Sequence, residues 1–115
     1  MKTKELINKL NKFNPDGNFR TVLNFLDWDR EELDGIVYAA SQYDYVELHC
    51  INDFNTKGLT VKELIGQLKN ADPDGNQELI FNFFDNDDEQ LESGFDYISI
   101  EEDYYNNLVL VIHTQ

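Results

Sequence analysis

The densest group of chemically active side chains is a run of carboxylates in the second half of the chain. Asp85, Asp87 and Glu89 are spaced two residues apart, as the first ligands of a calcium loop are. Asp96 occupies the twelfth position counted from Asp85, but the sixth, which a calcium loop requires to be glycine, is Gln90. We interpret the run as a solvated or partner-binding acidic loop, with weak Ca²⁺ binding as an alternative.

A second oxygen-rich segment, residues 72–76, also begins with the spacing of a calcium loop. Its sixth position is Gln77 where glycine is needed, and its twelfth is Phe83 where a bidentate glutamate is needed. The counterpart at residues 14–18 departs in the same way, with phenylalanine at both positions. We therefore predict a plain turn in both places, and we expect neither a metal ion nor a cofactor.

The nucleophilic and basic residues form no catalytic pattern. His49 and His113 each stand in an apolar run without a carboxylate or cysteine at ligand spacing, which is typical of a structural or surface histidine. No serine lies in a nucleophile elbow, and no glycine-rich loop could hold a phosphate. The single cysteine, Cys50, excludes an intrachain disulfide and is interpreted as a small buried hydrophobe. The sequence therefore predicts a protein that is not an enzyme.

Charge is the strongest functional signal. The chain has 115 residues with 23 acidic and 9 basic side chains, a net charge of −14. All nine Lys and Arg lie at or before Lys69, and residues 70–115 carry twelve acids. Such a surface repels nucleic acids and anionic membranes and attracts basic proteins. The predicted partner-binding residues are Asp85, Asp87, Asp88, Glu89, Glu92 and Asp96 in one patch, Glu101, Glu102 and Asp103 in a second patch at the opposite end of a strand pair, and Trp28 as a contact specific to the first copy.

The elements that position these residues come from an internal repeat. Residues 4–7 recur as residues 62–65, and the Pro-Asp-Gly-Asn segment at 15–18 recurs at 73–76, both at an offset of 58. One inserted residue then changes the offset to 59, which aligns Tyr38 with Tyr97. Agreement at one spacing indicates a tandem duplication. We predict a first repeat at residues 1–57 and a second, strongly acidic repeat at residues 58–115.

Each copy has the pattern of a helix followed by three strands. Apolar residues recur at helical spacing from Leu6 and again from Leu64, and only the second helix has a capping box, formed by Thr60 and Glu63. Strands are predicted at residues 19–26, 36–42 and 46–51, then at 78–84, 95–100 and 108–113, with acidic loops at 27–35 and 85–94. The predicted fold is α+β, built from two αβββ repeats whose antiparallel sheet or sheets share a core around a pseudo-twofold axis.

The helix opening Thr60-Val61-Lys62-Glu63-Leu64-Ile65, followed by Leu68 and the Pro-Asp turn, resembles small uncharacterised phage and prophage domains. The resemblance covers about the first 25 residues of each copy, implies an origin in a phage or mobile element, and carries no catalytic residue. In charge and size the chain is also similar to anti-CRISPR and anti-restriction proteins, which act as nucleic-acid mimics.

Together these features predict an inhibitor that binds the basic nucleic-acid groove of a host defence nuclease or RNA-guided effector. Two alternatives stay open: an immunity protein that neutralises a nuclease toxin, and a structural or accessory phage protein whose acidity only aids solubility. The chain shows neither an apolar stretch of about 20 residues, as a membrane span needs, nor a signal peptide. We therefore expect a cytoplasmic protein, in the host cytoplasm if a phage encodes it, with no direct contact to nucleic acid or membrane; its oligomeric state is left open.

Overall fold

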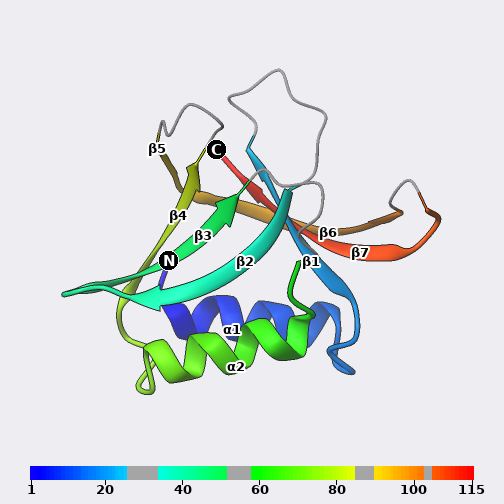
Figure 1. Ribbon diagram of the computed structural model, residues 1–115. Helices are drawn as coiled ribbons and strands as arrows, with labels where there is room; N and C mark the ends of the chain where they lie inside the picture. Colours follow the sequence, from blue (N-terminus) through cyan, green and yellow to red (C-terminus); the bar gives the residue numbers. More distant parts are fainter. Residues whose placement is uncertain (26–33, 52–57, 85–89, 103–104) are drawn as a thin grey trace.

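The computed structural model describes residues 1–25, 34–51, 58–84, 90–102 and 105–115 and confirms an α+β fold. Two helices, α1 (Thr3–Phe13) and α2 (Val61–Ala71), lie side by side against one face of the strands (Figure 1). Neither described helix has the length and apolar character of a membrane-spanning segment. The strands are β1 (Arg20–Phe25), β2 (Asp34–Ser41), β3 (Tyr45–Ile51), β4 (Glu78–Phe84), β5 (Gln90–Ser93), β6 (Phe95–Glu102) and β7 (Leu108–Thr114).

The core forms between the helices and the inner face of the strands. Leu6 and Leu10 of α1 are fully buried, as are Leu64 and Leu68 of α2, because residues four apart share one face of a helix. Alternate strand residues meet them, since successive side chains of a strand point to opposite faces. The strand residues of this core are Leu23, Ile36, Val46, Leu48, Leu79, Phe81, Ile98, Leu110 and Ile112.

The two helices begin differently, as the sequence predicts. Thr60 and Glu63 form a complete capping box at the start of α2. Lys2 precedes α1 and provides no side-chain cap. At both helices, however, the first two backbone N–H groups donate hydrogen bonds to carbonyl oxygens in or beside the turn of the other copy. We call these four hydrogen bonds the reciprocal helix–turn contact. They are Thr3 N–H to Gln77 O (3.1 Å), Lys4 N–H to Gly75 O (3.0 Å), Val61 N–H to Phe19 O (2.9 Å) and Lys62 N–H to Gly17 O (3.0 Å).

Each helix ends in the predicted Pro-Asp-Gly turn. Gly17 and Gly75 both have φ of +71°, the left-handed region that suits glycine. Asp72, which is buried, accepts hydrogen bonds from the backbone N–H groups of Gly75 and Gln77 at 3.1 and 2.9 Å. Its carboxylate therefore holds the turn together, and both segments with calcium-like spacing are turns, as expected.

The strands follow the order β5-β4-β3-β2-β1-β7-β6, and this sheet is mixed rather than antiparallel as predicted. Strand β1 runs parallel to β7, and β3 runs parallel to β4. Both parallel pairs join one copy to the other, because the first strand of each copy lies beside the last strand of the opposite copy. The remaining pairs are antiparallel, and β1 and β2 share only two residue pairs, Val22 with Gly35 and Leu23 with Asp34.

The second copy contains one more strand than predicted. Gln90–Ser93, which the sequence analysis assigned to the acidic loop at residues 85–94, forms β5 beside β4. Only Gly94 separates β5 from β6, so the two terminal strands of the sheet are consecutive in the chain and the sheet must curve to bring these ends together (Figure 1). In the second copy, β5 pairs with β4 and β6 pairs with β7. In the first copy the single strand β2 makes both equivalent contacts, since its start pairs with β1 and the rest of it pairs with β3.

The reciprocal helix–turn contact predicts unequal effects of adding a methyl group at different glycines. A Cβ at Gly17 would lie 2.9 Å from Lys62 Cβ and one at Gly75 would lie 2.7 Å from Lys4 Cβ, whereas a Cβ at Gly66 meets nothing within 4 Å. Gly17→Ala and Gly75→Ala should each lower the free energy of unfolding by at least about 2 kcal/mol. Gly66→Ala should raise it by up to about 1 kcal/mol, since alanine favours a helix interior. Urea denaturation measures all three, and equal changes would contradict the contact.

The capping box predicts a pH-dependent contribution to stability. The backbone N–H and then the hydroxyl of Thr60 hold the pKa of Glu63 below its usual value by hydrogen bonding to the carboxylate. A lowered folded-state pKa means that the stabilisation is present above the usual pKa of 4.5 and is lost as the pH falls through the folded value. The difference in melting temperature between wild type and Glu63→Ala should therefore shrink in acid.

Glu5 is the matched control, because it occupies the same place in α1, where no box forms. The difference between wild type and Glu5→Ala should be smaller at neutral pH than that for Glu63→Ala. A Glu63→Ala difference that stays constant down to strongly acidic pH would contradict the assignment.

Candidate functional site

Charge divides between the layers of the fold as well as between the copies. The two helices contain five lysines and two glutamates, a net charge of +3, which leaves −17 for the rest of the chain. Because α1 and α2 lie side by side, the five helix lysines belong to one layer of the fold (Figure 1). Outside the helices, the described residues include eleven acids and two basic residues, a net charge of −9, so the described strands, hairpins and turns are acidic.

The structure describes four of the predicted partner-binding residues. Asp96, Glu101 and Glu102 are exposed on β6, with Asp96 near its start and the two glutamates at its end. Glu92 lies on β5, where its backbone is opposite Asn82 of β4. In the described part of the chain, no Lys or Arg forms an ion pair with the three exposed acids of β6. The predicted residues that lie outside the described ranges are Trp28, Asp85, Asp87, Asp88, Glu89 and Asp103.

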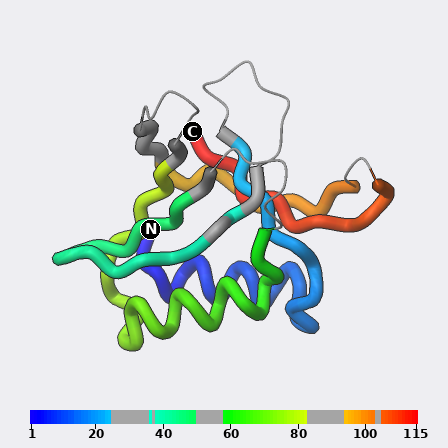
Figure 2. The backbone as a smooth tube through the Cα atoms, in the orientation of Figure 1, coloured from blue at the N-terminus to red at the C-terminus, as the bar shows by residue number. Residues whose placement is uncertain are grey.

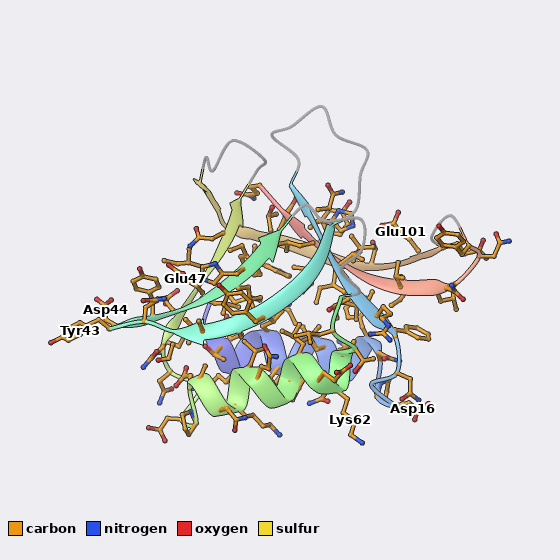
Figure 3. The ribbon with its side chains drawn as sticks, in the orientation of Figure 1. Asp16, Tyr43, Asp44, Glu47, Lys62 and Glu101 are labelled. Carbon is orange, nitrogen blue, oxygen red and sulfur yellow. The ribbon has the colours of Figure 1, made fainter. Side chains whose placement is uncertain are left out.

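Two hairpins extend to opposite ends of the molecule (Figure 2). The β2–β3 hairpin has Tyr43 and Asp44 at its tip, both exposed, and Glu101 lies on the other side of the molecule toward the β6–β7 hairpin (Figure 3). Tyr105, which follows β6, is also largely exposed. An aromatic residue and carboxylates therefore occur together near each tip, a combination that suits contact with a basic protein surface.

The sheet face opposite the helices carries two similar pairs of stacked rings. Tyr38 of β2 stacks on His49 of β3 with ring centroids 4.7 Å apart and an interplanar angle of 14°. Tyr97 of β6 stacks on His113 of β7 at 4.1 Å and 10°. In each case the tyrosine is opposite its histidine in the strand register and directly follows an irregularity in the pairing. Both histidines are buried, with less than a tenth of their surface exposed.

The second-copy stack belongs to a hydrogen-bonded group. The Ser99 hydroxyl lies 2.8 Å from Nε2 of His113 and donates to Oε2 of Glu101, also at 2.8 Å. Oε2 of Glu101 lies 3.3 Å from the same Nε2. The other ring nitrogen, Nδ1, is 3.4 Å from the Nδ2 amide of Asn24 on β1. We call Tyr97, Ser99, Glu101 and His113 the β6–β7 cluster.

A serine, a histidine and an acid in contact invite comparison with a catalytic triad, and the geometry does not match one. In a triad the acid orients one ring nitrogen while the other accepts the serine proton. In the β6–β7 cluster Ser99 and Glu101 both lie at Nε2, and the amide donor of Asn24 faces Nδ1, which must accept. Glu101 therefore contacts the same nitrogen as the serine, and the partner of the other nitrogen is an amide and not a carboxylate.

In the first copy a carboxylate from a different position contacts the histidine, and it is more buried. Oε2 of Glu47 lies 2.5 Å from Nε2 of His49, and both side chains are 10% exposed. The Gln42 amide donates to the same carboxylate oxygen at 3.4 Å. Glu47 and His49 share the outer face of β3 because they are two residues apart, while Val46 and Leu48 point into the core. The carboxylate is thus enclosed here and open to solvent in the β6–β7 cluster, where Glu101 is 46% exposed.

The carboxylate beside each histidine was not predicted from the sequence. The spacing of Glu47 and His49 was a usable signal, since residues two apart on a strand share a face. The contact between Glu101 and His113 left no such signal, because it depends on how β6 pairs with β7. Within the described residues, no three or more His, Cys, Asp or Glu side chains are grouped as metal ligands would be.

Comparison with known proteins gives no match, since no protein-family model, curated protein or solved structure is significantly similar to this chain.

The different enclosure of the two carboxylates predicts different effects on stability. Glu47→Ala should lower the free energy of unfolding by about 2–3 kcal/mol, because it leaves His49 buried without the carboxylate. Glu101→Ala should cost less than about 1 kcal/mol, because water can replace a half-exposed carboxylate. Denaturant titration measures both changes, and similar losses for the two variants would contradict the assignment.

Proposed function

We propose that this protein is a non-catalytic inhibitor that binds the basic, nucleic-acid-binding groove of a nuclease through the exposed acids of its strands and loops. The observation that supports this function best is the separation of charge between the helices, at +3, and the other described residues, at −9. Fold stability does not require such a separation, since like charges that are crowded together repel.

The physical basis is competition for a groove lined by Lys and Arg. Duplex DNA carries one negative charge per about 1.7 Å of its axis, and such a groove is arranged to neutralise that density. Exposed carboxylates that form no ion pair with a described Lys or Arg, such as those of Asp96 and Glu102, can take the place of phosphates. Long-range attraction then steers the encounter, and the lysines of the helices orient the protein with its sheet toward the groove.

An immunity protein that neutralises a nuclease toxin would use the same surface, so this alternative differs in the target and not in the mechanism. A structural or accessory role, in which the acidity only aids solubility, predicts a different result in a nuclease assay. It predicts that nuclease activity is unaffected at any salt concentration.

The test is a cleavage assay with a panel of bacterial restriction and RNA-guided nucleases, with and without the protein. We expect inhibition of at least one nuclease at about 50 mM salt and its loss near 300 mM, as the Debye length falls from roughly 14 to roughly 6 Å. Asp96→Asn combined with Glu102→Gln should weaken this inhibition about fivefold, by about 1 kcal/mol for two exposed charges.

The matched control is Asp16→Asn combined with Asp74→Asn, which removes two exposed charges from the turns beside the helices. This control should inhibit as wild type does. A second variant neutralises Asp85, Asp87, Asp88 and Glu89, the loop predicted from the sequence, and should abolish inhibition while the circular dichroism melt stays intact. Equal effects of the strand pair and the turn pair would overturn the proposed surface, and no inhibition at low salt would overturn the function.

A further inference from the structure

We propose that the β6–β7 cluster is a binding site for one arginine side chain of a basic partner protein. This inference rests on the proposed function, because it names the residue that part of the acidic surface recognises. Three features support the site: an aromatic platform, an oriented carboxylate and a contrast with the first copy.

The platform is the ring of Tyr97. One face of the ring lies against the His113 imidazole at 4.1 Å and 10°, which fixes its orientation. Tyr97 nevertheless keeps 50% of its surface exposed, so the surface turned away from the imidazole is available to a ligand. A guanidinium group stacks on such a ring through cation–π and planar contact.

The carboxylate of Glu101 provides the charged partner beside this platform. Its Oε2 accepts from the Ser99 hydroxyl at 2.8 Å and lies 3.3 Å from Nε2 of His113, the ring on which Tyr97 stacks. These contacts hold the carboxylate in one orientation before any ligand binds. No donor to Oε1 occurs among the described side chains, and 46% of the Glu101 side chain is exposed. An arginine that stacks on Tyr97 can therefore donate to this carboxylate at little cost in side-chain entropy.

The geometry favours arginine over lysine. The guanidinium group is planar, weakly hydrated and able to stack while its N–H groups reach a carboxylate in the same plane. The ammonium group of lysine is a compact, strongly hydrated charge and gains less from an aromatic face. A site that offered carboxylates alone would not distinguish the two residues.

The first copy provides an internal comparison. Tyr38 stacks on His49 in the same way, and Gln42 stands where the offset of 59 places Glu101. The carboxylate near this stack, Glu47, is enclosed and already contacts His49 and Gln42. The first copy thus has the aromatic stack without an exposed carboxylate, and we assign no arginine site to it.

The test is an NMR titration of the full-length protein with two matched probes, acetyl-Gly-Arg-Gly-Arg-Gly-amide and its lysine counterpart, at low salt. The arginine peptide should bind about fivefold more tightly, which corresponds to the roughly 1 kcal/mol of a cation–π contact at an exposed site. The largest shifts should occur at the ring of Tyr97 and at the backbone amides of Ser99 and Glu101. Tyr97→Leu should remove the preference for arginine, and Glu101→Gln should weaken binding of both peptides.

Two further variants keep the test decisive. Tyr97→Phe keeps the ring and should keep the preference, which separates loss of the platform from loss of the fold. Tyr38→Leu changes the first-copy stack and should leave both affinities unchanged. Equal binding of the two peptides to wild type, or equal effects of Tyr38→Leu and Tyr97→Leu, would overturn the site.

The peptide titration tests the arginine site and the cleavage assay tests nuclease inhibition, so each proposal can be refuted without the other. An arginine preference without nuclease inhibition would support the site and overturn the proposed function. Nuclease inhibition without an arginine preference would support the function and overturn the site.

Discussion

The reciprocal helix–turn contact is the constraint on which the rest of the structure depends. Each helix begins on backbone carbonyls beside the turn that ends the other helix, and the two glycines leave no room for a side chain at this approach. The parallel pairs β1–β7 and β3–β4 extend the same dependence to the strands. Neither copy can complete its core or its sheet alone, so the two helices share one layer. That shared layer places both sets of lysines on one side and both hairpins at opposite ends.

Most of the local structure could be predicted from the sequence, and the pairing between distant strands could not. Helical periodicity, the Thr60–Glu63 capping box and the Pro-Asp-Gly turns each depend on residues within a few positions of one another. Parallel pairing of β1 with β7 joins residues about ninety positions apart, and no local pattern encodes it. Strand β5 was missed because its four residues follow a run of carboxylates that is typical of a loop.

The same distinction applies to the candidate site. Composition identified exposed acids on β6, because an excess of carboxylates must lie at a surface. The stack of Tyr97 on His113 depends instead on the irregularity between Phe95 and Tyr97, which sets the tyrosine opposite the histidine. A shift of one residue in this register would turn the tyrosine to the other face of the sheet. Side chains that act together across strands therefore needed the three-dimensional structure, whereas the sign of the surface charge did not.

The dependence of each copy on the other also bears on how the two could diverge. A chain with a single copy could form these contacts only with a second chain, and its stability would then depend on protein concentration. In such a symmetric dimer every substitution appears twice, so a carboxylate enclosed on one side is enclosed on both. A covalent link between two such halves removes the concentration dependence and allows the two halves to differ in sequence. Glu101 illustrates such a difference, because Gln42 stands at its place in the first half and only the second half has an exposed carboxylate beside its aromatic stack.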